Sequence, residues 1–169
     1  MSRAFVKELD GDQIADDLPE LPQSSHPNYI TPEGFTALQR HVAKLQMVLR
    51  GLKQDAEDLQ VQQQRRHTAR DLRWQLERLN RAIVVDLGLQ PRHLVAFGAK
   101  VTVSHDSGVV VAYRIVGEDE TNLDEGQIGW TSPLAQALLN REVDDEVLWK
   151  RPAGDQRLTI VAIDYPPAS

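Results

Sequence analysis

The sequence predicts an α+β chain of two parts, an antiparallel helical hairpin followed by a mainly antiparallel β domain with one short helix. Three observations lead to this prediction. Apolar residues recur every three or four positions over residues 31–86, short β-branched runs separated by turn signals fill residues 92–169, and the helix-breaking run Leu87–Pro91 lies between them. These two periods are typical of paired helices and of strands, respectively.

The hairpin is predicted from two apolar seams that have the spacing of a coiled coil. Folding one seam onto the other pairs their members in order around a turn near residue 59, so each seam finds its partner within the chain. A monomer is therefore expected. The first seam contains Phe35, Leu38, Val42, Leu45, Leu49, Leu52 and Ala56, and the second contains Ala69, Leu72, Leu76, Leu79 and Ile83.

The first helix has a clear start signal. Thr31 is a good N-cap, Pro32 suits the first helical position, and Glu33 complements the positive end of the helix dipole. Gly51 weakens the distal end of the same helix.

Acidic residues gather where the hairpin is expected to turn, at the end of an arm roughly 40 Å long. Two interpretations remain open for them. They form a probe that reaches into a partner, or they are solvated charges that end one helix and open the next. The residues are Asp55, Glu57 and Asp58. A small basic stripe of Arg65, Arg66 and Arg70 follows them, as either a solvated face or a contact for RNA or for acidic groups of a partner.

The β domain is predicted from its turns and strands. Residues 101–103 and 109–116 form one hairpin, and residues 143–150 and 158–163 form another. Residues 128–130 form a short strand between the two hairpins. After this strand Ser132 caps a short helix with Pro133 at its first position.

Composition limits the function classes. The chain has 169 residues, a net charge of −6 and no cysteine, so bulk attraction to nucleic acid, disulfides and thiolate zinc sites are not expected. It has no apolar run long enough to span a bilayer, and a cytoplasmic location is expected. The expected parts are an acidic, largely disordered tail (1–29), the hairpin (30–87), a linker (88–91) and the β domain (92–169).

Four strings of the β domain resemble the C-terminal domain of the GreA/GreB family of bacterial transcription elongation factors, in the same order and spacing. The start of the hairpin, Ile30–Phe35, is similar to the opening helix of the family. The resemblance covers about residues 30–165. The four strings are residues Tyr113–Glu120, Ser132–Leu139, Arg151–Gly154 and Ile160–Ile163.

The resemblance implies an FKBP-like C-terminal domain that docks on RNA polymerase, and a coiled coil that enters the secondary channel of the polymerase. Acidic tip residues would then help the polymerase to hold a second Mg²⁺, so that backtracked RNA is cut near its 3′ end by the polymerase itself. The resemblance also implies that the factor is not itself an enzyme and binds no cofactor alone. The implied Mg²⁺ ligands are Asp55 and Asp58, and the implied docking residues are Trp130, Thr131, Ser132, Pro133 and Leu134.

The chain departs from the family pattern at three places. The tip reads Gln54–Val61, without the usual Gly before the first Asp and without the usual Asn-Ala-Glu-Tyr. Each arm is shorter by about a heptad, on the order of 10 Å. The usual Gly-Asp after Glu142-Val143 is replaced by Asp144-Asp145.

These departures leave a second function open, a regulator that occupies the channel without cleavage and competes with true cleavage factors. A third alternative is an adaptor that acts without polymerase and uses Trp130 and Trp149 as anchors. Prolyl isomerase activity is not expected from the fold alone, because that site needs an aromatic-lined pocket. The aromatic residues of the β domain, Phe97, Tyr113, Trp130, Trp149 and Tyr165, are expected in its core or at its surface.

Overall fold

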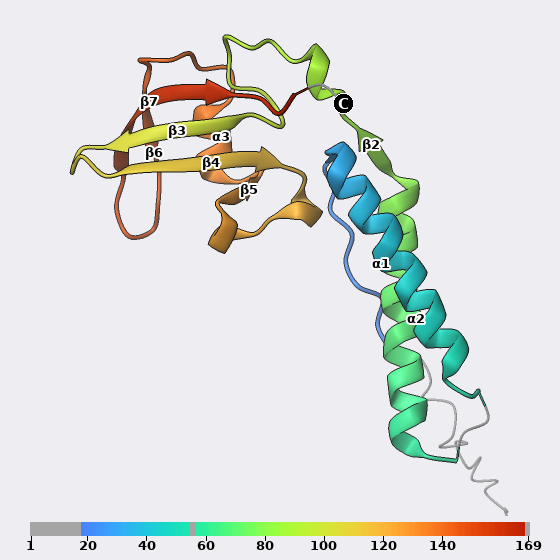
Figure 1. Ribbon diagram of the computed structural model, residues 1–169. Coiled ribbons are helices and arrows are strands. Elements are labelled where there is room, and N and C mark those ends of the chain that lie inside the picture. The colour runs from blue at the N-terminus through green and yellow to red at the C-terminus, as the bar shows by residue number, and fades with distance from the viewer. Residues whose placement is uncertain (1–17, 55–56, 168–169) are drawn as a thin grey trace, which may run out of the picture.

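The computed structural model describes residues 18–54 and 57–167 and shows an elongated molecule made of two parts (Figure 1). A pair of long helices lies at one end, and a curled five-stranded sheet with a short helix lies at the other. The predicted α+β class is confirmed. The helices are α1 (Pro32–Gly51), α2 (Leu59–Asn80) and α3 (Pro133–Leu138), the 3₁₀ turns are η1 (Leu87–Leu89), η2 (Glu118–Glu120) and η3 (Leu123–Glu125), and the strands are β1 (Asn28–Ile30), β2 (Ala82–Val84), β3 (Lys100–His105), β4 (Val110–Val116), β5 (Gln127–Gly129), β6 (Glu146–Trp149) and β7 (Gln156–Asp164).

The helix pair packs through most of the predicted seam. Leu38, Val42 and Leu72 are buried together with Ile30, and further seam residues cover this small core. The prediction for Ile83 is wrong, because α2 ends at Asn80 and Ile83 lies in β2 with 48% of its surface exposed. The partly buried members of the cluster are Phe35, Leu45, Leu49, Leu79 and Ala82.

The ends of the helices follow local signals. The Thr31 side chain accepts a hydrogen bond from the backbone N–H of Gly34 at 3.0 Å, so the predicted N-cap of α1 is confirmed. The helix ends at Gly51 after 20 residues, which at 1.5 Å per residue is about 30 Å and shorter than expected. The connection between the helices is residues 52–58, slightly before the predicted turn.

A two-stranded parallel sheet joins the segment before α1 to the segment after α2. Strand β1 pairs with β2 from Asn28 opposite Ala82 to Ile30 opposite Val84. We expected residues 1–29 to form a disordered tail. Residues 1–17 lie outside the described residues, whereas residues 18–29 contact α2 and end in β1.

The five-stranded sheet has the order β5-β4-β3-β7-β6. The β3–β4 and β6–β7 pairs are antiparallel, as the two predicted hairpins require. Strands β4 and β5 are parallel, which the sequence analysis did not predict. A register shift between Thr102 and Val103 interrupts the β3–β7 pairing.

The core of the β domain lies between the sheet and α3. Ser132 caps α3 by accepting a hydrogen bond from the backbone N–H of Ala135 at 3.3 Å, as predicted. The linker expected at residues 88–91 is partly ordered as η1, and Leu87 is buried beside Gly98. Within the described residues, no helix is long and apolar enough to cross a membrane. The buried core residues are Val95, Ala99, Val101, Val103, Ile115, Ile128, Leu134, Ala135, Leu138, Val147, Leu158 and Ile160.

Candidate functional site

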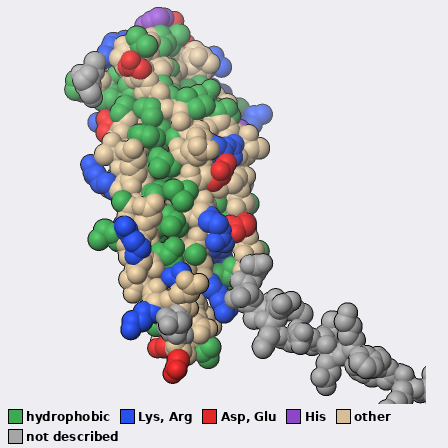
Figure 2. Space-filling model, turned by 90° about the vertical axis from the view of Figure 1, so that its right-hand side faces the viewer, with side chains coloured by type: hydrophobic (Ala, Val, Ile, Leu, Met, Phe, Trp, Pro, Cys, Tyr) green, Lys and Arg blue, Asp and Glu red, His purple; other side chains and the backbone are tan. Residues whose placement is uncertain are grey.

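The connection between α1 and α2 lies at the end of the helix pair that is farthest from the five-stranded sheet (Figure 1). Figure 2 shows acidic side chains at this end, below a zone of Lys and Arg side chains. Glu57 and Asp58 are exposed there, whereas Asp55 lies outside the described residues. The structure thus places two of the three predicted tip carboxylates together at the far end of the molecule.

Asp58 has a structural role at this tip. It is the N-cap of α2, and its Oδ1 atom accepts a hydrogen bond from the backbone N–H of Gln60 at 2.8 Å. A carboxylate at this position also complements the helix dipole. The interpretation of the acidic residues as helix-opening charges therefore holds for Asp58, while Glu57 makes no cap.

The predicted Mg²⁺ ligands at the tip are Asp55 and Asp58. Among residues 18–54 and 57–167, no group of three or more His, Cys, Asp and Glu side chains is arranged to hold a metal ion. Mg²⁺ is usually bound through one or two carboxylates together with waters and a ligand from the substrate. Of the two predicted ligands, only Asp58 lies within the described residues, so the pair itself stays a prediction.

The basic residues behind the tip are partly engaged in the fold. The Arg65 guanidinium donates hydrogen bonds to the backbone carbonyls of Leu49 at 3.3 Å and Leu52 at 2.9 Å, which satisfies acceptors at the end of α1. Arg70 pairs with Asp71 at 3.1 Å. Of the predicted stripe, Arg65 therefore holds the two helices together near their tip.

Among the predicted docking residues, Trp130 contacts other aromatic residues of the same chain. Its ring packs edge-on against Tyr29 at a centroid distance of 5.3 Å and against His26 at 5.9 Å. Trp130 is partly buried and joins the segment before α1 to the β domain. The half-buried Trp149 lies under the Arg151 guanidinium, 4.9 Å from its ring centroid.

The other four predicted docking residues differ in exposure. The Thr131 hydroxyl donates a hydrogen bond to Glu118 at 3.3 Å, Ser132 caps α3, and Leu134 is in the core. Pro133 is exposed at the first position of α3. Pro133 is the one residue of the predicted set that is exposed.

A junction that the sequence analysis missed fixes the helix pair to the β domain. Its centre is Arg78 of α2, whose side chain is 1% exposed. Arg78 Nε donates to both carboxylate oxygens of Asp119, at 2.8 and 3.0 Å, and Nη2 lies 3.6 Å from Glu118 Oε2. Asn28 accepts a hydrogen bond from the guanidinium and donates one to the backbone carbonyl of Arg78 at 2.7 Å.

A second contact of the junction joins the start of α1 to η2. Glu120 accepts hydrogen bonds from the backbone N–H of Thr31 at 3.0 Å, from the Thr31 hydroxyl and from the backbone N–H of Gly117 at 2.9 Å. A Cβ atom at Gly34 would collide with the Glu120 side chain, and one at Gly117 would collide with the backbone carbonyl of Tyr29. Two glycines thus permit the close approach of the two parts.

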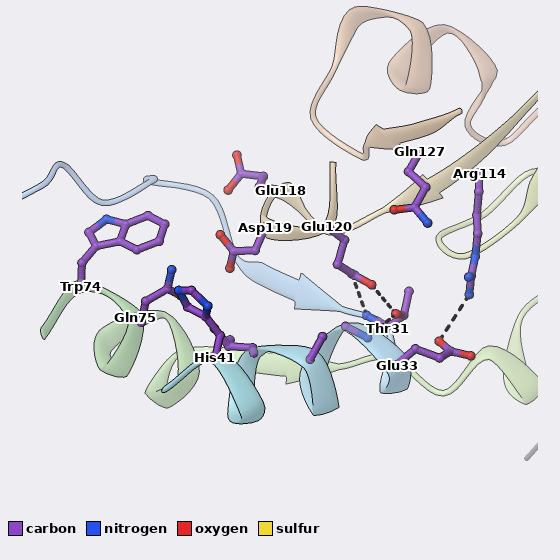
Figure 3. Close-up of a pocket in the computed structure, with 13 residues that line it drawn as sticks. Thr31, Glu33, His41, Trp74, Gln75, Arg114, Glu118, Asp119, Glu120 and Gln127 are labelled. Atoms are coloured by element: carbon purple, nitrogen blue, oxygen red, sulfur yellow. Dashed lines mark hydrogen bonds and ion pairs between the residues drawn. The ribbon is translucent and has the colours of Figure 1, made fainter. Parts of the chain in front are cut away.

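A groove of about 740 Å³ with both charged and apolar lining residues lies beside this junction (Figure 3). Glu33 and Arg114 form an ion pair across it at 3.4 Å. Partial burial raises the pKa of Glu33, but a hydrogen bond from its own backbone N–H and the charge of Arg114, together with the Thr31 side chain, outweigh burial and lower the pKa below 4.5. The groove therefore has ionised groups from α1 and from the sheet on its two sides.

The junction could not be found from spacing alone. Arg78 lies outside the apolar seam, and Asn28 lies in a segment that was expected to be disordered. The acidic run Glu118–Glu120 was noticed only as part of a string that resembles the family. In the structure, that string and the string that begins the hairpin meet at the junction, so both parts of the resemblance describe one contact.

The fold and the junction define a helix pair fixed to a mixed β domain. A family profile described as "Transcription elongation factor, GreA/GreB, C-term" matches residues 90–165. The chain is 34% identical over 161 residues to transcription elongation factor GreB of Pseudomonas aeruginosa, covering 87% of this chain and 96% of that protein. It is 30% identical over 158 residues to GreA of Legionella pneumophila (strain Corby), covering 84% of this chain and 98% of that protein.

The chain therefore belongs to the GreA/GreB family of transcription elongation factors, and the resemblance found in its sequence is confirmed. Among solved structures, a GreA/GreB factor from Nitrosomonas europaea is 20% identical, with a TM-score of 0.41, and the comparison covers 83% of this chain and 99% of that one. GreA factor homolog 1 of Thermus thermophilus is 22% identical, with a TM-score of 0.40 over 82% of this chain and 99% of that one.

Proposed function

We propose that this chain binds RNA polymerase through its β domain and places the tip of the helix pair in the secondary channel, where it regulates elongation. The observation that carries the proposal is the buried junction around Arg78, which holds a tip with exposed carboxylates far from the domain proposed to dock. Membership of a family of elongation factors supports it. The chain supplies position and charge, and the chemistry is done by the polymerase.

Docking is proposed at the N-terminal end of α3, where Pro133 is exposed. We expect Pro133→Asp to weaken binding to polymerase at least tenfold, because it introduces a charge at the surface. An acidic residue in the first helical turn is compatible with the helix dipole, so α3 should persist. Leu89→Asp, at an 82% exposed position outside α3, is the matched control and should leave the affinity unchanged. Equal affinities for both variants would contradict docking at α3.

Two actions at the tip are compatible with this placement. In the first, Asp55, Glu57 and Asp58 help to hold a Mg²⁺ that the polymerase also binds, and cleavage of backtracked RNA is stimulated. Such a cation can orient or generate the attacking hydroxide. The exposure of Glu57 and Asp58 at the tip supports this action.

In the second action the tip occupies the channel and competes with cleavage factors without stimulating cleavage. The hydrogen bond between Asp58 and Gln60 supports this alternative, because it gives the carboxylate a structural use at the start of α2. The 20-residue length of α1 also favours a limited reach.

A stalled-complex assay separates the two actions. Asp58→Asn keeps an N-cap of similar strength but removes the charge, whereas Asp58→Ala removes both. If the tip supplies a metal ligand, both variants should lose release of 3′ fragments; if Asp58 only caps α2, the asparagine variant should act like the parent chain. A chain that blocks fragment release by a cleavage factor, and releases none itself, would establish the second action. A chain that neither binds polymerase nor competes would overturn the proposed function.

A further inference from the structure

A second groove lies on α2 behind the tip and has a positive lining. It has a volume of about 430 Å³, and three of its seven lining side chains are arginines. We call it the arginine groove. Its lining residues are Leu18, Gln54, Gln62, Arg65, Arg66, Ala69 and Arg73.

The segment that precedes β1 leads into this groove. Residues 18–27 run beside α2, away from the β domain (Figure 1). Trp74 Nε1 donates a hydrogen bond to the backbone carbonyl of Pro22 at 3.0 Å, and Arg81 donates one to the carbonyl of Ser24 at 3.2 Å. These contacts fix the direction of the segment, and Leu18, the first described residue, lies in the groove wall.

The charge of the segment already matches the charge of α2. Glu20 pairs with Arg73 of the groove at 2.6 Å. The sequence before Leu18 continues this pattern, because residues 8–17 contain five carboxylates and no basic residue. The carboxylates belong to Glu8, Asp10, Asp12, Asp16 and Asp17.

We propose that the acidic segment of residues 8–17 binds in the arginine groove of α2 of the same molecule. Asp16 and Asp17 directly precede a residue of the groove wall, so their effective concentration there is high. A groove lined by arginines favours an occupant that carries several carboxylates. The consequence rests on the proposed function: the bound segment covers positive charge just behind the tip and competes there with other anions, including RNA.

The contact can be tested in the full chain by backbone ¹⁵N relaxation, without polymerase. We expect order parameters of residues 8–17 above about 0.6, the upper limit for flexible backbone. They should fall below this value in the double variant Arg66→Gln and Arg73→Gln, and in high salt, because the Debye length shrinks from about 10 Å at 0.1 M to about 3 Å at 1 M. The matched control is Arg40→Gln with Lys44→Gln on α1, which removes the same charge outside the groove and should change nothing.

Three results would overturn the proposal. Order parameters below about 0.6 in the parent chain would show that the segment is not bound. Ordering that survives the Arg66 and Arg73 substitutions would place the segment elsewhere. The third result concerns the NMR signals of the arginine guanidinium groups in the groove. If they respond to a 12-nucleotide single-stranded RNA, but not to neutralisation of the five carboxylates, the groove binds nucleic acid instead. None of these results depends on polymerase, so the contact can fail while the proposed function holds.

Discussion

Arg78 is the residue on which the junction depends most. We expect Arg78→Leu to lower the free energy of unfolding by about 3 kcal/mol, because it leaves Asp119 and Glu118 without their cation in a largely buried place. The measurement is urea denaturation followed by the fluorescence of Trp74 and Trp130.

The control for this prediction is Arg73→Gln, which breaks an ion pair whose two side chains are 57% and 61% exposed. Exposed pairs contribute about 0–1 kcal/mol, so this variant should be almost as stable as the parent. If both variants lose the same free energy of unfolding, the buried ion pairs of Arg78 contribute no more to stability than an exposed pair does.

Asp144 occupies a backbone conformation that favours glycine. Its φ angle is 73°, at the position where the family pattern has Gly. Asp144→Gly should therefore raise the free energy of unfolding, by about 0.5 kcal/mol after the larger entropy of the unfolded glycine chain is included. Thermal unfolding monitored by circular dichroism measures the change.

The neighbouring residue provides the control. Asp145 Oδ2 accepts a hydrogen bond from the backbone N–H of Glu142 at 2.9 Å. Asp145→Gly should thus lower stability by about 1 kcal/mol. Opposite signs for the two glycine variants are the expected result, and a loss of stability in both would refute the argument from the φ angle.

At the scale of elements, the ion pair between Glu33 of α1 and Arg114 of β4 makes the contact between helix and sheet depend on pH. The pKa of Glu33 is lowered in the folded chain, so the unfolded chain binds more protons near pH 4.5. The contribution is present above the ordinary pKa and is lost as the pH falls through the lowered pKa. Because both groups are partly exposed, it should stay below about 1 kcal/mol.

Glu33→Gln tests this contribution. The stability difference between the parent chain and this variant should be largest near neutral pH and should vanish in acid, as measured by urea denaturation at several pH values. Arg114→Gln should remove only part of this pH dependence, because the backbone N–H of Glu33 and the Thr31 side chain still lower the pKa of Glu33. A difference that is constant with pH would mean that Glu33 acts through packing and not through charge.

Elements whose signals are local could be predicted from the sequence. Thr31 and Ser132 lie within a few positions of the backbone groups that they cap. The β1–β2 pair could not be predicted from the sequence, because both long helices separate its two strands and each strand has only three residues. Strand propensity is informative over longer runs, so such short strands depend on their tertiary contacts.

Like the elements, the candidate sites differ in whether local sequence signals or tertiary contacts define them. The tip followed from the periodicity of the seam, although the structure ends α1 at Gly51, begins α2 at Leu59 and gives Asp58 a capping role. The docking residues followed from a resemblance, and the structure shows that the partly buried Trp130 packs against Tyr29 and His26. The junction needed knowledge of the whole molecule, because Asn28, Arg78 and Asp119 are brought together only when both parts have folded.

At the scale of the whole molecule, the proposed function depends on the distance between the docking domain and the tip. Deleting one heptad from each arm, residues 46–52 and 60–66, keeps Leu45 opposite Leu72 in the seam and retains the tip. It shortens the arm by about 10 Å. We expect affinity for polymerase to stay within about threefold, because the β domain is unchanged, and the effect on the transcript to be lost.

The deletion also removes Arg66, so the full-length chain with Arg66→Gln is its matched control. Arg65 is deleted together with the Leu49 and Leu52 carbonyls to which it donates. That control keeps the reach and should retain most of the effect on stalled complexes. Circular dichroism must first show that the shortened helix pair is folded. If the shortened chain binds and acts like the parent, the distance from the β domain to the tip does not determine activity. A chain that loses binding together with activity would instead show that the helix pair itself docks on the polymerase.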